Sequence, residues 1–303
     1  MRIVADRIRD VLKFGTGAAR RGLRRQAGRS LVLAYHNVRP DHERARGERG
    51  LHVSRSAFCR QLDFLQAHCD VVPLVDVLPG ATARARPRVA ITLDDGYVGA
   101  LTIGLEELTR RSLPATYFVI PGRLGHEFWW DRLADPLGGS IPADARPQVL
   151  DSLRGEESLI AAWAAERGIR LAADLPDWAR AGSLDLVTHA YGATGITLGA
   201  HTWTHPNLAA LTPERMADEL ERSRAWLGER FPRFLPWLSF PYGRHSEVVV
   251  RVAGNAGYAG CVAIGQQVVW IERAEPRAPS VVPRLDVPST WSLARFALRV
   301  ADA

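Results

Sequence analysis

Thr92-Leu93-Asp94-Asp95-Gly96-Tyr97 follows directly on an apolar, β-branched run, Val89-Ala90-Ile91. A run of this kind predicts a buried strand of a parallel sheet. Two adjacent carboxylates at the end of such a strand repel each other and are costly to remove from water, so they require a compensating partner. A metal cation is such a partner if one carboxylate binds it while the other stays free as a base. The alternative is a simple helix cap, because acidic residues are common at helix N-termini.

A pair of histidines follows a second predicted strand, Ile196-Thr197-Leu198-Gly199-Ala200, in the segment His201-Thr202-Trp203-Thr204-His205. Two histidines four residues apart can bind one cation if the segment turns helically after the strand. With one carboxylate of the Asp94-Asp95 pair they form a two-histidine, one-aspartate set. Because both motifs stand at the end of an apolar strand, the sequence favours a metal site over two unrelated polar segments.

A third motif, Phe240-Pro241-Tyr242-Gly243, completes a recognisable order. Together the three motifs resemble the first three motifs of the polysaccharide deacetylases, the NodB-homology carbohydrate esterases. The resemblance covers roughly residues 31–296. It implies an α/β fold, namely a distorted (β/α) barrel that binds a divalent metal, and the removal of acetyl groups from amino sugars.

The motifs imply a division of roles among the site residues. Asp95, His201 and His205 are the expected metal ligands, and Asp94 is the expected base that takes a proton from the attacking water. Zinc is the favoured ion, with cobalt, nickel or iron as alternatives, because two histidines and a carboxylate also suit non-haem iron. By the same resemblance, Tyr242 is expected to contact the substrate, with a nearby backbone N–H stabilising the oxyanion.

Two further catalytic candidates come from comparison with the family. His36 ends the predicted first strand in a Tyr-His pair like that of the poly-N-acetylglucosamine deacetylases, in which the histidine replaces the general acid that other members carry near the C-terminus. No Leu-x-His motif stands near the end of this sequence, so His36 is the predicted acid. Many members carry an arginine two positions before the motif proline, where it clamps the catalytic aspartate. Ser239 occupies that position here, and Arg284 is the candidate replacement, although an arginine at a strand end more commonly forms a structural ion pair.

The segment 121–195 is longer than a minimal deacetylase requires and predicts a helical insertion, with helices near 145–167 and 183–193. It contains the aromatic run Phe128-Trp129-Trp130. Trp129, Trp130 and Trp203 are candidates for stacking on sugar rings. Large aromatic side chains gain most of their energy from burial, so one of Trp129 and Trp130 is expected to anchor the insertion instead.

The 303 residues fit one large α/β domain, with the barrel domain at 31–303 and a distinct segment at 1–30. Cys59, Cys69 and Cys261 form no CxxC pair, which favours a reducing compartment and hence the cytoplasm. Residues 1–30 carry two acidic residues and nine basic ones: Arg2, Arg7, Arg9, Lys13, Arg20, Arg21, Arg24, Arg25 and Arg29.

Apolar residues in the segment 1–30 fall at near-helical spacing, which predicts a basic amphipathic helix able to lie on an anionic membrane surface. Peripheral attachment to the inner membrane face is therefore expected, with an ordinary helix packed on the domain as the alternative. Aromatic residues do not interleave with the basic ones after Phe14, so nucleic-acid binding is not expected. Apolar runs of signal-peptide or membrane-spanning length are also absent from the sequence.

The sequence thus predicts a metal-dependent hydrolase that removes the N-acetyl group of an amino sugar in a glycan or glycan precursor. Two other classes stay open. A non-haem iron oxygenase could use the same ligands, although the pairing of the Asp-Asp-Gly and Pro-Tyr-Gly motifs opposes it. A non-catalytic glycan-binding barrel is opposed by the intact aspartates and histidines. Ferrous-dependent oxygen consumption would support the first, and glycan binding without acetate release the second.

Overall fold

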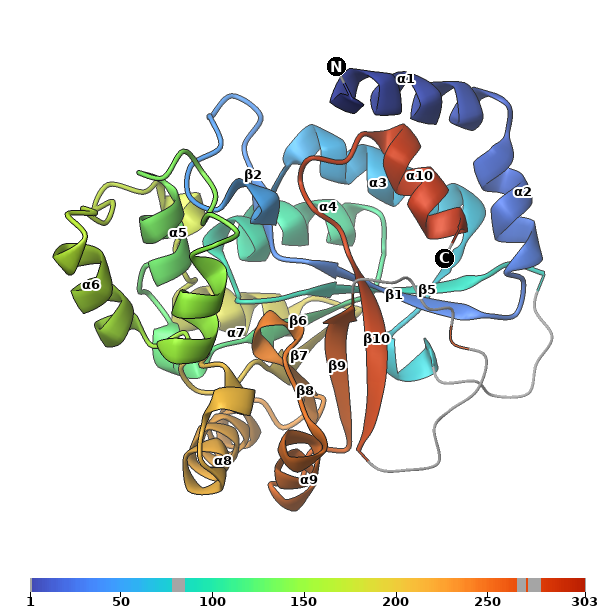
Figure 1. Ribbon diagram of the computed structural model, residues 1–303. Helices are drawn as coiled ribbons and strands as arrows, with labels where there is room; N and C mark the ends of the chain where they lie inside the picture. Colours follow the sequence, from blue (N-terminus) through green and yellow to red (C-terminus); the bar gives the residue numbers. More distant parts are fainter. Residues whose placement is uncertain (1, 78–84, 266–270, 272–278, 303) are drawn as a thin grey trace.

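A closed barrel of parallel strands forms the centre of the computed structural model, which describes residues 2–77, 85–265, 271 and 279–302, with side chains from Arg9 onward. Seven strands form the ring in the order β1, β10, β9, β8, β7, β6 and β5, and β5 pairs again with β1 to close it (Figure 1). This confirms the predicted barrel. The strands are β1 (Ser30–Tyr35), β5 (Arg88–Leu93), β6 (Ala115–Val119), β7 (Ile196–Ala200), β8 (Trp237–Ser239), β9 (Gly260–Gly265) and β10 (Ser280–Asp286).

Three shorter strands flank the ring. β2 (Asn37–Arg39) and β3 (His52–Ser54) form a separate parallel pair beyond the end of β1, and β4 (Asp70–Val71) pairs with the start of β5. β1, β5 and β6 are buried at every position. Their continuous apolar character follows from this burial, because a barrel strand faces side chains on the inside and helices on the outside.

Helices cover the outside of the barrel, and several begin where the sequence provides a capping side chain. Thr212 Oγ1 accepts a hydrogen bond from Arg215 N, and Pro213 occupies the first helical position of α8. The helices are α1 (Arg2–Gly15), α2 (Ala18–Arg25), α3 (Arg55–His68), α4 (Leu105–Arg110), α5 (Trp129–Ala134), α6 (Glu157–Glu166), α7 (Leu184–Gly192), α8 (Pro213–Arg230), α9 (Glu247–Asn255) and α10 (Leu293–Ala301).

The alternation of side chains along each strand decides what lies inside the barrel. A buried cluster that includes Val32, Ala90, Phe118, Val262 and Val282 fills the interior, one residue from each of five strands. Residues two and four positions further along a strand point the same way. The polar side chains that follow these apolar ones therefore line the mouth of the barrel at the carboxyl ends of the strands.

The segment between β6 and β7 carries α5, α6 and α7. α5 and α6 lie at the end of the barrel where the strands finish (Figure 1), whereas α7 packs against β7. α6 and α7 fall within the two expected helical stretches. α5 was not expected, and it starts inside the aromatic run at Trp129. The predicted limits of the insertion and of the domains stay predictions.

The N-terminal helices pack on the barrel's outer layer beside α10 (Figure 1). Asp10 pairs with Arg295 at 3.7 Å, and the rings of Phe14 and Phe64 lie 6.4 Å apart. Leu23 is buried. α1 and α2 are therefore part of the packed structure on their inner side. Among the described residues, no helix has the length and apolar content that crossing a membrane requires.

A buried carboxylate ties α3 to α4, and its contribution should depend on pH. Glu107 accepts hydrogen bonds from Arg55 at 2.8 Å and from Arg111 at 2.6 Å. Burial raises the pKa of Glu107, but hydrogen bonds from Arg110, Arg111 and Arg55 outweigh it and lower the pKa from 4.5 to about 2. A carboxylate with a lowered pKa stabilises the fold fully above its unfolded-state pKa, and this stabilisation is lost as the pH falls toward 2.

We predict that Glu107→Gln lowers the free energy of unfolding by about 1–3 kcal/mol at pH 7, because three arginines lose a buried charged partner. At pH 3 the difference between the two proteins should shrink, since the wild-type carboxylate is then losing its advantage. Urea unfolding of both proteins at the two pH values measures this. An equal difference at pH 7 and pH 3 would contradict the assignment.

Candidate metal centre and active site

Polar side chains converge at the mouth of the barrel because several strands have an inward-facing polar residue at or near their carboxyl end. Asp94 follows β5 in register with the interior residues Ala90 and Thr92, and Arg284 lies two positions after Val282 in β10. By the same alternation, Ser239 ends β8 two positions after Trp237. The barrel thus places groups from distant parts of the chain around one space.

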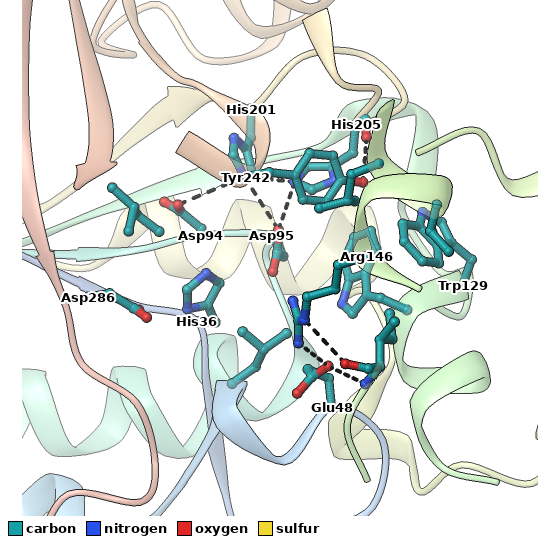
Figure 2. A pocket seen from close by; sticks show the side chains of 16 residues that line it. His36, Glu48, Asp94, Asp95, Trp129, Arg146, His201, His205, Tyr242 and Asp286 are labelled. Carbon is teal, nitrogen blue, oxygen red and sulfur yellow. Dashed lines mark hydrogen bonds and ion pairs between the residues drawn. The ribbon is translucent and has the colours of Figure 1, made fainter. Parts of the chain in front are cut away.

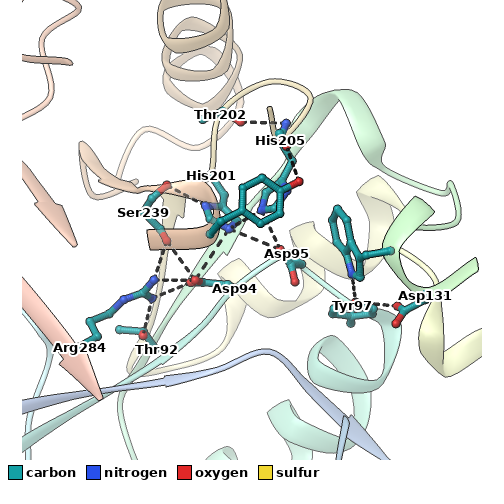
Figure 3. Close-up of polar contacts among 12 residues, drawn as sticks. Thr92, Asp94, Asp95, Tyr97, Asp131, His201, Thr202, His205, Ser239 and Arg284 are labelled. Carbon is teal, nitrogen blue, oxygen red and sulfur yellow. Dashed lines mark hydrogen bonds and ion pairs between the residues drawn. The ribbon is translucent and has the colours of Figure 1, made fainter. Parts of the chain in front are cut away.

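Three of these groups form a candidate metal site. His201 Nε2 lies 3.4 Å from Asp95 Oδ1, His205 Nε2 lies 3.5 Å from the same oxygen, and the two Nε2 atoms are 3.1 Å apart (Figure 3). All three residues are buried, and their candidate ligand atoms lie within 4.8 Å of one another. The structure therefore brings the three predicted ligands together.

The other nitrogen of each histidine is already bonded, which fixes the nitrogen that is free to bind a metal. His201 Nδ1 donates to Ser239 O at 2.7 Å. Tyr242 Oη donates to His205 O at 3.1 Å and can therefore accept from His205 Nδ1, also at 3.1 Å. Both rings then turn an unprotonated Nε2 toward Asp95, as in metal-ligating histidines held by a hydrogen bond on the far nitrogen. The donor set fits a divalent cation.

The pKa values of the two histidines differ in direction. Burial lowers the pKa of both; His201 next to it lowers that of His205 further, well below the usual range. For His201 the carboxylates of Asp94 and Asp95 outweigh burial and raise the pKa. His205 is therefore neutral, as a metal ligand must be, whereas a cation bound at the site would compete with a proton for His201.

The histidine segment does not turn helically, contrary to the expectation from its spacing. Thr202 and His205 have φ angles of 63° and 70°, and the segment after β7 is irregular. Asp95 and Tyr242 also have positive φ, at 72° and 59°. Four of the six described non-glycine residues with positive φ thus lie in the site segments. Such strained backbone persists where the surrounding structure holds it, and it is concentrated at functional sites.

Asp94 is held by a buried arginine of β10, 190 residues further along the chain. Arg284 Nη1 donates to Asp94 Oδ1 at 2.7 Å and Nη2 donates to Oδ2 at 2.6 Å (Figure 3). Ser239 Oγ donates to Asp94 Oδ2 at 3.0 Å and accepts from Arg284 Nη2 at 2.7 Å. Ser239, at the position of the family's usual arginine, thus does not supply the clamping guanidinium. It instead bonds both members of the Asp94–Arg284 pair. Arg284 occupies the clamping position that the sequence analysis suggested.

The clamp keeps Asp94 ionised. Burial raises the pKa of this carboxyl, but the charges of Arg284 and His201 and the hydrogen bonds from Arg284 outweigh burial and lower the pKa below its usual range. Asp94 and the Arg284 side chain are almost fully buried, at 1% and 0% exposure. A bidentate pair of this kind fixes the orientation of the carboxylate as well as its charge.

A cavity of about 260 Å³ opens onto these residues (Figure 2). His36 and Asp286 line it on one side and Trp129 on the other, so the predicted acid shares the cavity with the predicted base and metal ligands. Burial raises the pKa of Asp286, against the opposing effect of His36. The lining residues are His36, Glu48, Leu51, Asp94, Asp95, Trp129, Trp130, Ile141, Arg146, Val149, Leu150, His201, His205, Tyr242, Ile264 and Asp286.

The aromatic candidates fall in different places. Trp129, Trp130 and Tyr242 line the cavity, and Trp130 Nε1 donates to Tyr97 Oη at 2.6 Å while its ring lies 4.7 Å from that of His205. Trp130 is thus anchored, and both tryptophans are mostly buried, at 3% and 6% exposure. Trp203 does not line the cavity. Its ring lies under the Arg222 guanidinium, 4.6 Å from it, so its predicted contact with substrate has no support from its position.

Sequence reasoning missed the buried network behind Trp130. Asp131 accepts from Tyr97 Oη at 2.7 Å, from Glu48 N at 2.7 Å and from His52 Nε2 at 3.0 Å. The network fixes the tyrosine to which Trp130 is bonded, and it ties the segment after β2 to the insertion. The only signal in the sequence was the acidic residue that ends Phe128-Trp129-Trp130-Asp131.

Three further cavity residues were also missed. Glu48 Oε2 accepts from Arg146 Nη2 at 2.9 Å and from Ile141 N at 3.1 Å (Figure 2). These bonds join the segment between β2 and β3 to the insertion. Asp286 ends β10, and an acidic residue at a strand end was the signal that could have identified it. Glu48 and Arg146 carry no such signal, because they are 98 residues apart and only the fold pairs them.

A model of the polysaccharide deacetylase family matches residues 81–261, more than half of the chain. The chain belongs to this family. The match spans the Asp-Asp, histidine and Pro-Tyr-Gly motifs, so the predicted family is confirmed. No curated protein matches the sequence.

Solved structures of deacetylases share the fold of this polysaccharide deacetylase. They include the Streptococcus pyogenes deacetylase PplD in complex with acetate, 17% identical, with a TM-score of 0.60 over 90% of this chain and 98% of that one. IcaB from Ammonifex degensii is 19% identical, with a TM-score of 0.60 and the same coverage. The de-N-acetylase from Aggregatibacter actinomycetemcomitans is 17% identical, with a TM-score of 0.59 over 87% of this chain and 97% of that one. At these identities the likeness shows the fold.

We predict that Tyr242→Phe lowers the affinity for a divalent metal about 10- to 100-fold, because His205 Nδ1 loses the hydroxyl that orients its ring. Competition with a chromophoric chelator measures the affinity. Tyr35→Phe is the matched control, since it removes a buried tyrosine hydroxyl that bonds Gln61 and does not line the cavity. Equal affinities in the wild type and both variants would show that Tyr242 does not support His205.

Proposed function

We propose that this polysaccharide deacetylase is a zinc-dependent enzyme that hydrolyses the N-acetyl group of an amino sugar in a glycan or glycan precursor. The convergence of Asp95, His201 and His205 beside the arginine-clamped Asp94 carries the proposal. Zinc suits two imidazole nitrogens and one carboxylate oxygen, and cobalt, nickel or iron could occupy the same donors. When bound, the ion supplies a Lewis acid that polarises the acetyl carbonyl and lowers the pKa of water.

Asp94 accepts the proton of the attacking water in this proposal. The carboxylate is ionised and its orientation is set by Arg284 and Ser239, so it is ready to accept a proton without first reorganising. Its lowered pKa makes it a weak base in isolation. The proton transfer therefore depends on an attacking water that is itself acidified.

His36 donates the proton that the departing amine requires. It lies on the side of the cavity where Asp286 also faces inward, and the charges of the two residues interact (Figure 2). A backbone N–H at Tyr242 donates to the oxyanion, consistent with the left-handed turn that this residue adopts.

The cavity walls support a sugar as substrate. Trp129 lines one wall beside Tyr242, with the two rings 6.5 Å apart, and Glu48 and Arg146 add a carboxylate and a guanidinium group to the lining. Aromatic faces stack on the apolar faces of sugar rings, and the polar groups can bond hydroxyls. The proposed partner is therefore an acetylated amino-sugar glycan or its precursor, and not a nucleic acid.

We also propose a cytoplasmic enzyme that attaches peripherally to the inner membrane face. The free cysteines Cys59, Cys69 and Cys261 support a reducing compartment. On α1, Val11 and Leu12 are exposed by 58% and 65%, and Lys13 beside them is also exposed. Exposed apolar residues next to basic ones suit the surface of an anionic leaflet.

The aspartates provide the sharpest test of the proposed reaction. Asp94→Asn should bind metal almost as the wild type does and lose acetate release by orders of magnitude, because the base is removed while all three candidate metal ligands are kept. Asp95→Asn should lose metal affinity together with activity. Acetate release from a panel of N- and O-acetylated sugars, with metal content measured on the same samples, distinguishes the two. If both variants kept metal and activity, the proposed roles would be wrong, and Asp94 and Asp95 would serve only as a helix cap.

The membrane contact is tested by sedimentation with anionic vesicles at low salt. Removing residues 1–28 would expose the buried face beneath α2, so substitutions are the better probe. We predict that Val11→Ser combined with Leu12→Ser reduces the bound fraction, since the apolar contact is lost while the charge is kept. Val75→Ser, at another exposed apolar position, is the control. Equal sedimentation of the wild type and both variants would contradict a contact through α1.

A further inference from the structure

Two neighbouring hollows lie at the end of the barrel opposite the active site. Their lining residues come from α1, α2, α3 and the segment before β5, elements whose arrangement Figure 1 shows. One, of about 440 Å³, is lined by Arg20, Arg24, His68 and Arg86, and we call it the arginine crevice. The other, of about 320 Å³, is the apolar crevice, and Phe14, Ala19 and Phe64 line it. Arg20 and His68 line both crevices, so the two lie next to each other.

The arginine crevice has an unbalanced positive charge. Arg20 and Arg24 lie one helical turn apart on α2, both exposed, and no acidic side chain pairs with either of them in the part of the chain that the structure describes. Arg86 is held from behind, because its Nη2 donates to Cys69 O at 2.7 Å and to Gln66 O at 2.9 Å. Arg86 Nε also forms an ion pair with Asp70 Oδ1 at 3.6 Å, and the excess positive charge of the crevice therefore rests on Arg20 and Arg24.

The charges in this crevice already act on one another. Burial and the charges of Arg20 and Arg86 lower the pKa of His68. The imidazole is therefore mostly neutral at pH 7, and the arginines carry the positive charge. Three guanidinium groups around one hollow suit a ligand with several acceptor oxygens and more than one negative charge.

The apolar crevice restricts the ligand further. The rings of Phe14 and Phe64 approach each other across the contact between α1 and α3, and Phe64 also lies 4.7 Å from His68. A free phosphate ion would use only the arginines, whereas an alkyl chain attached to it would gain from burial beside Phe14, Ala19 and Phe64. The two neighbouring crevices thus match a charged head and an apolar tail.

We propose that these crevices bind a lipid with a phosphomonoester head, the phosphate among Arg20, Arg24 and Arg86 and the start of the acyl chain beside Phe14 and Phe64. Such a phosphate carries between one and two negative charges at neutral pH and three strong acceptor oxygens. The inference extends the proposed membrane contact of α1, on which it builds, by assigning a specific lipid site. It is independent of the deacetylation chemistry, because the crevices lie at the other end of the barrel.

Calorimetric titration of the full chain with three matched compounds tests the ligand class. Decanoyl lysophosphatidic acid carries both parts, glycerol 3-phosphate lacks the chain, and monodecanoylglycerol lacks the phosphate. We expect the first to bind about tenfold or more tightly than either of the others, because only it fills both crevices. Glycerol 3-phosphate binding as tightly as the lysolipid would reduce the site to a bare anion site and overturn the proposal. An absence of lysolipid binding would overturn it as well.

Paired arginine variants test the location. Arg20→Gln with Arg24→Gln should weaken lysolipid binding about tenfold or more, since two charge-assisted contacts are lost. Arg21→Gln with Arg25→Gln removes the same charge from the same helix at exposed positions that line neither crevice, and it should leave binding within about twofold of the wild type. Equal weakening by both pairs would show general surface attraction and refute the crevice.

Two other measurements separate this inference from the proposed function. Acetate release should be unchanged in both double variants, which confirms that they are folded and that the active site is intact. If the Arg20/Arg24 double variant loses lysolipid binding but sediments with vesicles as the wild type does, the lipid site is separate from the contact that α1 makes with the membrane. The Asp94→Asn variant should lose acetate release and still bind the lysolipid, because the reaction and the lipid site use different residues.

Discussion

The buried ion pair between Asp94 and Arg284 is the interaction on which the arrangement of the active site depends. Two charges with almost no exposed surface are stable only when each is fully paired, because the desolvation cost is several kcal/mol per ion. The bidentate contact, with Ser239 and Thr92 completing the hydrogen bonds, meets that condition. Since β5 and β10 both pair with β1, the ion pair forms only when these three strands have assembled side by side.

This constraint links the reaction to the fold. Asp94 and Asp95 are neighbours in sequence, yet one points into the barrel toward Arg284 and the other, with positive φ, faces the two histidines. The strained backbone at Asp95 is what lets adjacent carboxylates take different partners. Their mutual repulsion is offset by a guanidinium on one side and by a metal-binding set on the other.

Much of the barrel and the ligand set could be predicted because both depend on local patterns. Apolar runs predicted β5 and β7, and the motifs at their ends predicted the residues that converge. The route of the His201–His205 segment could not be predicted, because it is held by contacts that Ser239 makes with His201 and Tyr242 makes with the left-handed His205. The pairing of Glu48 with Arg146 joins residues 98 positions apart and leaves no local trace. Asp286 was visible as an acid at a strand end, but only the closed barrel shows that it faces His36.

Metal dependence is the central claim, and a titration of metal into metal-free protein tests it most directly. Acetate release from an N-acetylated amino sugar should be absent without metal, rise in proportion to added zinc or cobalt, and level off at one equivalent per chain, because Asp95, His201 and His205 form a single site. Full activity in the metal-free protein, or activity that does not respond to added metal, would contradict the account.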